Sequence, residues 1–127
     1  MTWTRMEEQK EKPTVLVVDD EPFVRLYACG VMEDAGYPTK EAGDADEAMQ
    51  LIAADGITVV ITDIEMPGSM DGLALARTVR ATWPHIAVIV ASGRRLPRTD
   101  ELPEEISFLS KPFSQERLLS LVSDAGR

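Results

Sequence analysis

Cysteine and histidine are almost absent from this chain of 127 residues, which contains one of each, Cys29 and His85. A lone cysteine forms no intramolecular disulfide bond, and a zinc site takes several cysteine or histidine ligands. The sequence also has no apolar run long enough to cross a bilayer and no secretory signal in residues 1–13. We therefore expect a cytoplasmic protein without membrane contact, in which Cys29 is a small core residue.

Positive charge is scarce as well, because 22 aspartate and glutamate residues outnumber 13 lysine and arginine residues and give a net charge of −9. Such a surface repels the phosphate backbone of nucleic acids, so we expect no direct nucleic-acid binding. Arg94, Arg95 and Arg98 form a local exception. They belong either to a solvated loop or to a surface that guides a phosphate or an acidic partner.

The length fits one domain of the commonest size. Hydrophobic residues make up 44% of the chain and charged residues 28%, the ordinary balance of a soluble globular protein. Residues 1–13 (MTWTRMEEQKEKP) show no hydrophobic pattern. We expect a flexible tail over residues 1–13 and one domain over residues 14–127.

Five short segments have the composition of β-strands, and three of them are continuous runs rich in β-branched residues, typical of strands buried on both faces. The predicted strands are residues 14–18, 39–42, 57–62, 86–91 and 106–109. The run 39–42 is weaker than the others, so we place it near the edge of the sheet.

Amphipathic patterns between these strands predict helices. The predicted helices are residues 22–35, 44–54, 71–83 and 115–122. Asp20 and Asp71 are placed to cap two of them. On the first helix, the expected inward residues are Phe23, Leu26, Tyr27, Gly30, Val31 and Met32. Two prolines interrupt residues 93–105, so any further helix there is expected to be short, kinked or absent. Alternating strands and helices indicate an α/β fold with a doubly wound parallel sheet.

Polar side chains follow the predicted strands. Asp19 and Asp20 come directly after the first strand, Asp63 after the third, and Ser92 and Lys111 after the last two. The carboxyl ends of parallel strands share one edge of a sheet, so we expect these groups to converge there. Carboxylates gather in this way when a cation offsets their repulsion, and oxygen ligands suit Mg²⁺.

The sequence resembles the receiver domain of response regulators, the phosphoacceptor half of a two-component signalling pair. The resemblance covers residues 14–123 and is carried by four fragments in order. They are VLVVDDEP (15–22), TDIEMPGSMDG (62–72), VIVAS (88–92) and FLSKPF (108–113). It implies a flavodoxin-like, five-stranded parallel sheet with strand order 2-1-3-4-5.

The resemblance assigns a role to each polar residue at the strand ends. Asp63 resembles the aspartate that a histidine kinase phosphorylates, and Lys111 resembles the lysine that pairs with the phosphoryl oxygens. Asp20 resembles the direct Mg²⁺ ligand and Asp19 the ligand that acts mainly through water. The backbone carbonyl of Glu65 is the further metal ligand that the resemblance implies.

Three further residues match positions with a conformational role in the family. Ser92 resembles the switch hydroxyl, and Phe108 stands at the aromatic switch position. Pro112 matches the proline that follows a cis peptide bond. For Ser92 a turn role is the alternative, and for Phe108 simple core packing is an equally good interpretation.

The implied function is that of a phosphoacceptor, not of an enzyme beyond self-catalysed phosphotransfer and dephosphorylation. A sensor histidine kinase or a histidine phosphotransfer protein donates the phosphoryl group, and an unknown downstream protein responds to it. The chain ends at Arg127 without an output domain, so we expect a stand-alone receiver. The sequence does not decide between a monomer and a homodimer.

Some features depart from the family pattern. Gly68 and Ser69 stand where one residue is usual, residues 93–105 are short and proline-rich, and Phe108 lacks the hydroxyl of the common tyrosine. The sequence suggests two other functions. A phosphatase of the haloacid-dehalogenase type is disfavoured, because Asp19 and Asp20 are adjacent and 127 residues leave no room for a cap domain. A pseudo-receiver or phosphate sink that acts by protein binding remains the alternative.

Overall fold

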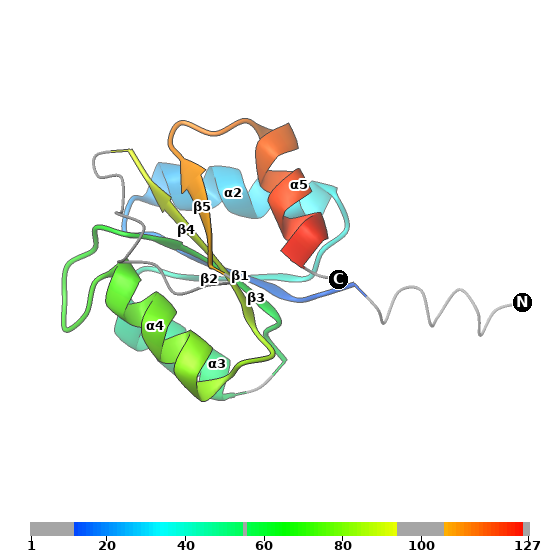
Figure 1. Ribbon diagram of the computed structural model, residues 1–127. Coiled ribbons are helices and arrows are strands. Elements are labelled where there is room, and N and C mark those ends of the chain that lie inside the picture. Colours follow the sequence, from blue (N-terminus) through cyan, green and yellow to red (C-terminus); the bar gives the residue numbers. More distant parts are fainter. Residues whose placement is uncertain (1–11, 55, 94–105, 126–127) are drawn as a thin grey trace, which may run out of the picture.

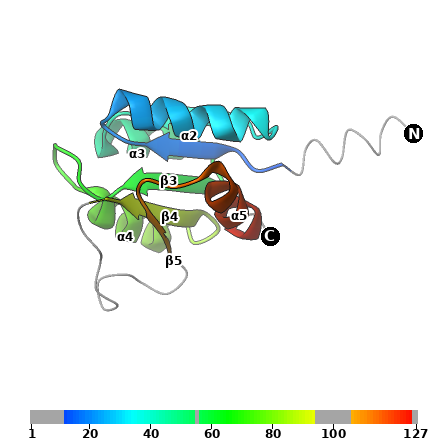
Figure 2. The ribbon, with the colours of Figure 1, turned by 90° about the horizontal axis from the view of Figure 1, so that it is seen from above.

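The computed structural model describes residues 12–54, 56–93 and 106–125. They form one parallel sheet of five strands in the order β2-β1-β3-β4-β5. The strands are β1 (Val15–Val18), β2 (Thr39–Ala42), β3 (Val59–Asp63), β4 (Ala87–Ser92) and β5 (Ile106–Ser110). In Figure 2 the arrows of β1, β3 and β4 point the same way. The predicted strand order is confirmed, and so is the edge position of residues 39–42.

Helices cover both faces of this sheet. The described helices are α2 (Pro22–Asp34), α3 (Ala45–Ala53), α4 (Gly72–Thr82) and α5 (Gln115–Ala125). Figure 1 shows α2 and α5 on one face and α3 and α4 on the other. The prediction about a helix within residues 93–105 concerns a segment that, apart from Gly93, lies outside the described residues. The same holds for the basic cluster at residues 94, 95 and 98.

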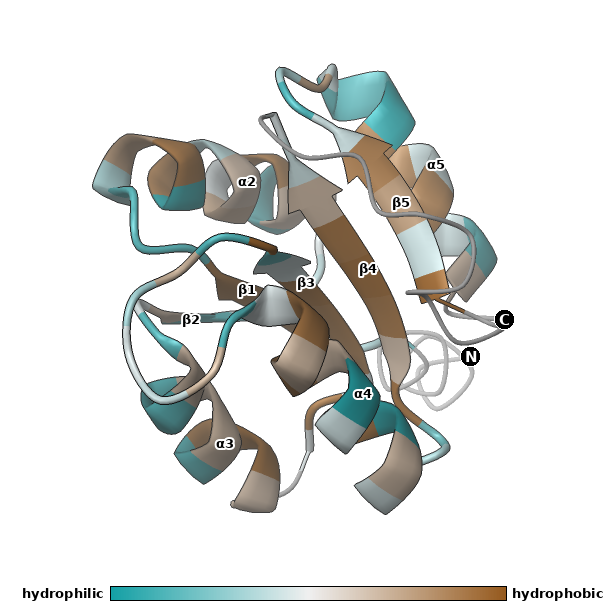
Figure 3. Cartoon of the chain, turned by 60° about the vertical axis from the view of Figure 1, so that its left-hand side comes forward, coloured by the Kyte–Doolittle hydropathy of each residue, from teal (hydrophilic) through white to brown (hydrophobic). Residues whose placement is uncertain are grey.

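Each face of the sheet has its own hydrophobic core, because successive side chains of a strand point to opposite faces. Val15 and Val17 of β1 belong to the core beneath α2 and α5. Leu16 and Val18 belong to the core beneath α3 and α4. In Figure 3, β3 and β4 are hydrophobic over most of their length. This double burial explains why the sequences of β1, β3 and β4 are continuous apolar runs rather than alternating ones.

The predicted inward face of α2 was partly wrong. Phe23 is 87% exposed, Leu26 66% and Tyr27 45%. The residues of α2 that are buried are Ala28, Cys29, Val31 and Met32. The helix carries two apolar stripes, and the stripe with these four residues packs on the sheet. Cys29 is a core residue as expected, and burial, with the charges of Glu41 and Glu33 adding to it, raises the pKa of its thiol to about 11.

The expected cap of α2 was also wrong. The helix begins after Glu21, whose side chain makes no capping hydrogen bond. The Asp19 carboxylate instead accepts a hydrogen bond from the backbone N–H of Glu21, at 2.9 Å. Asp20 therefore keeps its carboxylate free of the helix. In contrast, Asp71 caps α4 as predicted, since its side chain accepts from the N–H of Ala74.

Among the described helices, none has the length and apolar character needed to cross a membrane.

Candidate functional site

Strand register brings the polar residues of the sequence to one edge of the sheet. Val18 of β1 is paired with Thr62 of β3, so Asp19 and Asp63 follow at the same level. Ser92 of β4 is paired with Ser110 of β5, and Lys111 follows directly. Asp19, Asp63 and Ser92 are buried, although buried polar side chains are uncommon in protein cores.

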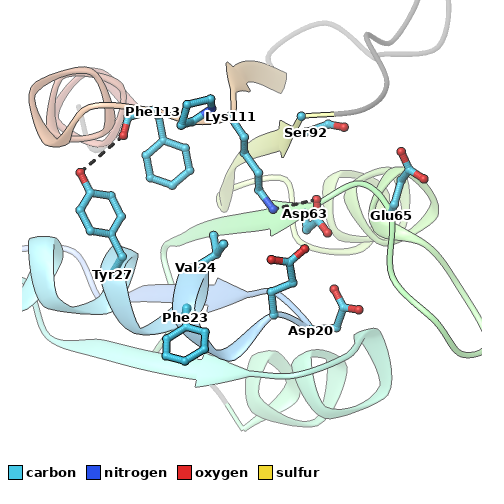
Figure 4. A pocket seen from close by; sticks show the side chains of 12 residues that line it. Asp20, Phe23, Val24, Tyr27, Asp63, Glu65, Ser92, Lys111 and Phe113 are labelled. Carbon is cyan, nitrogen blue, oxygen red and sulfur yellow. Dashed lines mark hydrogen bonds and ion pairs between the residues drawn. The ribbon is translucent and has the colours of Figure 1, made fainter.

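Lys111 lies between two of these carboxylates. Its Nζ atom is 2.8 Å from Oδ2 of Asp19. It is 3.2 Å from Oδ1 of Asp63, and Figure 4 shows this ion pair as a dashed line. The peptide bond between Lys111 and Pro112 is cis, as the resemblance implied. The backbone N–H of Lys111 donates to the carbonyl of Ser92 at 3.0 Å, which fixes the start of the loop after β5 to the end of β4.

Three carboxylates form a group that suits a metal ion. One oxygen each of Asp19, Asp20 and Asp63 lies within 4.8 Å of the others. Lys111 supplies one positive charge against these three negative ones, so the cluster keeps an excess of negative charge. A donor set made only of oxygens matches Mg²⁺, which binds one or two carboxylates and keeps several water ligands. The residues present therefore fit the ion that the sequence indicated.

The surroundings raise the pKa of both Asp63 and Lys111, which disfavours the charged form of Asp63 and favours that of Lys111. Burial raises the pKa of Asp63 above its ordinary value; Lys111 works against this shift, and Asp19 adds to it. Burial alone would lower the pKa of Lys111, but its contacts with Asp19 and Asp63 outweigh burial and raise the pKa. Lys111 is therefore a permanent cation at neutral pH, and ionised Asp63 is held at an energetic cost.

The loop between β3 and α4 presses closely on the backbone of Asp63. The N–H of Gly72 donates to the carbonyl of Ile64 at 2.7 Å. A Cβ atom on Gly72 would collide with the carbonyl of Asp63. In the same loop, Gly68 has a φ of +109° and Ser69 donates a hydrogen bond to Asp46 of α3. The extra residue of this loop is thus accommodated by a glycine turn and a contact with α3.

Two groups of site residues, apart from Pro112 in the second group, were missed in the sequence. Arg25 of α2 donates to the carbonyl of Asp19 at 2.7 Å, a contact that depends on how α2 lies against β1. The second group lines the apolar side of a cavity of about 720 Å³ that also contains Asp20, Asp63, Ser92 and Lys111. This group, the apolar wall, consists of Phe23, Val24, Tyr27, Pro112 and Phe113. Figure 4 shows Tyr27 and Phe113 side by side, and their ring centroids are 5.8 Å apart.

Comparison with known proteins identifies the family to which a chain with this site belongs. The family model described as the response regulator receiver domain matches residues 15–123. The chain belongs to this family.

The similar proteins agree with the assignment to the receiver family. The chain is 34% identical over 115 residues to the nitrogen assimilation regulatory protein NtrX of Azorhizobium caulinodans, covering 87% of this chain and 25% of that protein. It is 35% identical over 120 residues to the sensor kinase CckA of Brucella abortus, covering 87% of this chain and 12% of that protein. The chain thus spans about a quarter or less of the length of these curated relatives.

Solved receiver structures have the same fold. A response regulator receiver protein from Sinorhizobium medicae superposes with a TM-score of 0.84 at 27% identity, over 91% of this chain and 95% of that chain. The receiver domain of NtrX from Brucella abortus superposes with a TM-score of 0.78 at 33% identity, over 87% of this chain and 96% of that chain.

Of the other residues to which the resemblance assigns a role, two line the cavity and one packs against the core. Ser92 lines the same cavity as Asp63. The side chain of Glu65 is exposed and lines the cavity as well. Phe108 is partly buried and packs against the core beneath α3 and α4. It is on the strand next to Ser92, since Val90 of β4 is paired with it.

Proposed function

We propose that this receiver domain accepts a phosphoryl group on Asp63 in a Mg²⁺-dependent reaction and thereby switches a protein-interaction surface. The observation that carries the proposal is the burial of Asp63 at the tip of β3, beside Asp19 and Asp20 and 3.2 Å from the ammonium of Lys111. The donor is a sensor histidine kinase or a histidine phosphotransfer protein. Both the reaction and the domain's position in the cytoplasm, where ATP-driven kinases act, are part of this proposal.

The residues of the site explain how a carboxylate attacks a phosphorus atom that already carries negative charge. An oxygen of Asp63 forms the new bond to phosphorus, and the bond to the donor's imidazole nitrogen breaks. Lys111 neutralises charge on the phosphoryl oxygens from one side. Asp19, Asp20, Asp63 and the carbonyl of Glu65 would hold Mg²⁺, which supplies charge neutralisation on the other side. No general base is needed, because ionised Asp63 has no proton to lose.

The output follows from the charge that Asp63 gains. A phosphoryl group adds nearly two negative charges and three acceptor oxygens. Lys111 and the hydroxyl of Ser92 line the same cavity and are drawn toward them. Because Phe108 is on the neighbouring strand to Ser92, a movement at the end of β4 changes the packing of β5. We propose that the surface formed by β5 and α5 carries the signal to a downstream protein.

The apolar wall gives the donor protein a contact surface next to the phosphoacceptor. Phe23 and Tyr27 are exposed although they are large and hydrophobic, and both line the cavity that contains Asp63. Exposed apolar patches of this kind mark interaction sites. We propose that the donor's helices pack on this side of α2 while its phosphohistidine reaches Asp63.

The experiment that tests the proposal is phosphorylation by acetyl phosphate. With Mg²⁺, the wild-type chain should gain one phosphoryl group that is stable in acid and labile in base, measured by intact mass. Asp63→Asn is the control and should gain none. Labelling of the Asn variant would overturn the assigned site. A wild-type chain that takes no label would favour the alternative, a pseudo-receiver that binds partners without phosphorylation.

A further inference from the structure

Arg25 connects three elements at the edge of the acidic cluster. Its side chain is 22% exposed, and its guanidinium uses two different nitrogens. Nη1 donates to the backbone carbonyl of Asp19 at 2.7 Å, and Nε donates to Oε1 of Glu41 at 2.8 Å. Helix α2 is thereby tied to the end of β1 and to β2, one strand further out. A planar guanidinium suits this double contact, because its donors have fixed relative directions.

The carbonyl that Arg25 holds belongs to the peptide bond between Asp19 and Asp20. Asp19 is fixed by other contacts: its N–H donates to Ala42 at 3.1 Å, and its carboxylate accepts from the N–H of Glu21 and from Lys111. Asp20 is exposed. One of its carboxylate oxygens lies within 4.8 Å of an oxygen of Asp19 and of Asp63, and the bond from Arg25 restrains the backbone that carries this side chain.

We propose that Arg25 is a positioning residue for the divalent-ion site: it holds the Asp19–Asp20 peptide so that the Asp20 carboxylate faces Asp63. The proposal rests on the Mg²⁺ site of the proposed function and adds a residue that touches neither the ion nor the phosphoryl group. Groups that orient metal ligands from outside commonly change metal affinity by about 10- to 100-fold when they are removed.

Electrostatics and geometry predict opposite signs for the loss of Arg25. A positive charge near a cation site repels the ion, so charge alone predicts tighter metal binding after its removal. Loss of the restraint on the Asp19–Asp20 peptide predicts weaker binding. Glu41 allows the two effects to be separated, because removing Arg25 and Glu41 together leaves the net charge near the site unchanged.

The test measures the affinity for Mn²⁺, an ion with similar oxygen ligands, by the electron paramagnetic resonance signal of the free ion. Arg25→Met/Glu41→Gln keeps the apolar stem of Arg25 and removes both charges. We expect its dissociation constant for Mn²⁺ to rise about tenfold. Glu41→Gln alone keeps the bond from Arg25 to the Asp19 carbonyl, so its affinity should stay within about threefold of wild type.

Val122→Ala, in the core beneath α5, controls for general loss of stability. Its unfolding temperature should fall while its Mn²⁺ affinity stays that of the wild type. The proposal is overturned if the double variant binds Mn²⁺ as wild type does, or if Val122→Ala weakens binding equally. If the Asp20→Asn variant bound Mn²⁺ as tightly as the wild type does, the metal site of the proposed function would instead be refuted.

Discussion

The ammonium of Lys111 offsets the negative charge of two carboxylates. Replacing Lys111 therefore tests whether this charge is needed for stability, for Mg²⁺ binding or for both. In Lys111→Met the buried Asp19 and Asp63 lose their cation, so without Mg²⁺ the free energy of unfolding should fall by about 1–3 kcal/mol. Mg²⁺ affinity should be kept or increased, because a competing positive charge is gone. Phosphorylation by acetyl phosphate should slow by at least about tenfold. Urea unfolding in EDTA and in Mg²⁺, with labelling rates by mass, measures all three.

The Asp63→Asn variant is the matched comparison for this result, since it removes one of the anions instead of the cation. If Lys111→Met lost Mg²⁺ affinity as completely as Asp63→Asn, the ammonium would be needed to build the metal site and its assigned role would be wrong.

Asp63 itself should make the stability of the domain depend on pH. Burial raises its pKa above the ordinary value of 3.8, so the folded state keeps this proton to a higher pH than the unfolded state does. Stability is then lost as pH rises through the window that starts at 3.8 and ends at the folded pKa. In EDTA, Asp63→Asn should therefore unfold at a higher temperature than wild type at pH 7. The difference should shrink as the pH is lowered.

Glu116→Gln removes one negative charge at an exposed position and controls for the general effect of net charge. Thermal unfolding followed by circular dichroism between pH 4 and pH 8 is the measurement. A wild-type protein that is more stable than Asp63→Asn at pH 7 in EDTA would show that ionised Asp63 is not held at a cost.

At the scale of the elements, the sequence predicted the strands well and the orientation of α2 poorly. Runs such as residues 86–91 are buried on both faces, so composition alone identifies them. Helix α2 has two apolar stripes, and only packing against the sheet decides which one is buried. Phe23 and Tyr27 were for this reason assigned to the core, although they line the cavity beside Asp63.

The residues of the candidate site could likewise be predicted only in part from the sequence. Asp19, Asp20, Asp63, Ser92 and Lys111 could be predicted because each lies at or just after the carboxyl end of a strand, and parallel strands end at a common edge. Arg25 could not be, because its contacts with Asp19 and Glu41 depend on the placement of a helix between two strands. Its bond to Glu41 joins residues 16 positions apart that share no sequence pattern.

Two glycines should respond in opposite ways to the same substitution. Gly72 begins α4, and a Cβ there would collide with the carbonyl of Asp63, so Gly72→Ala should displace the loop between β3 and α4. We expect a loss of about 1–3 kcal/mol in the free energy of unfolding and weaker Mg²⁺ binding. Gly30 lies inside α2, and a Cβ there would meet no atom within 4 Å beyond its chain neighbours and the nearby backbone of the helix. Gly30→Ala should stabilise the domain by about 0.5–1 kcal/mol and leave Mg²⁺ binding unchanged.

Chemical denaturation and a Mn²⁺ titration of both variants check this pair. A Gly72→Ala variant with wild-type stability and affinity would mean that the loop yields without cost and does not position the site.

At the scale of the whole molecule, repulsion between carboxylates is concentrated at one edge of the sheet, where its strands end. Each face of the sheet is covered by two helices over a hydrophobic core, and the strand ends carry the buried charges. A rigid scaffold keeps Asp19 and Asp63 near each other, although their charges favour separation. An ion that binds at this edge should therefore stabilise the entire domain, because both faces of the sheet depend on β1 and β3.

Binding of Mg²⁺ to the folded state alone predicts a stabilisation that grows with the logarithm of its concentration, about 2.7 kcal/mol at 100 times the dissociation constant. The unfolding temperature should rise with Mg²⁺ and should rise much less with NaCl of equal ionic strength. NaCl screens the net charge of −9 as effectively but occupies no site. Asp20→Asn should reduce the Mg²⁺ effect to that of NaCl, because Asp20 is a ligand in the proposed site and is exposed, so its replacement leaves the core intact. If Mg²⁺ and NaCl raised the unfolding temperature equally in the wild type, the carboxylate cluster would be responding to ionic strength and not to a bound ion.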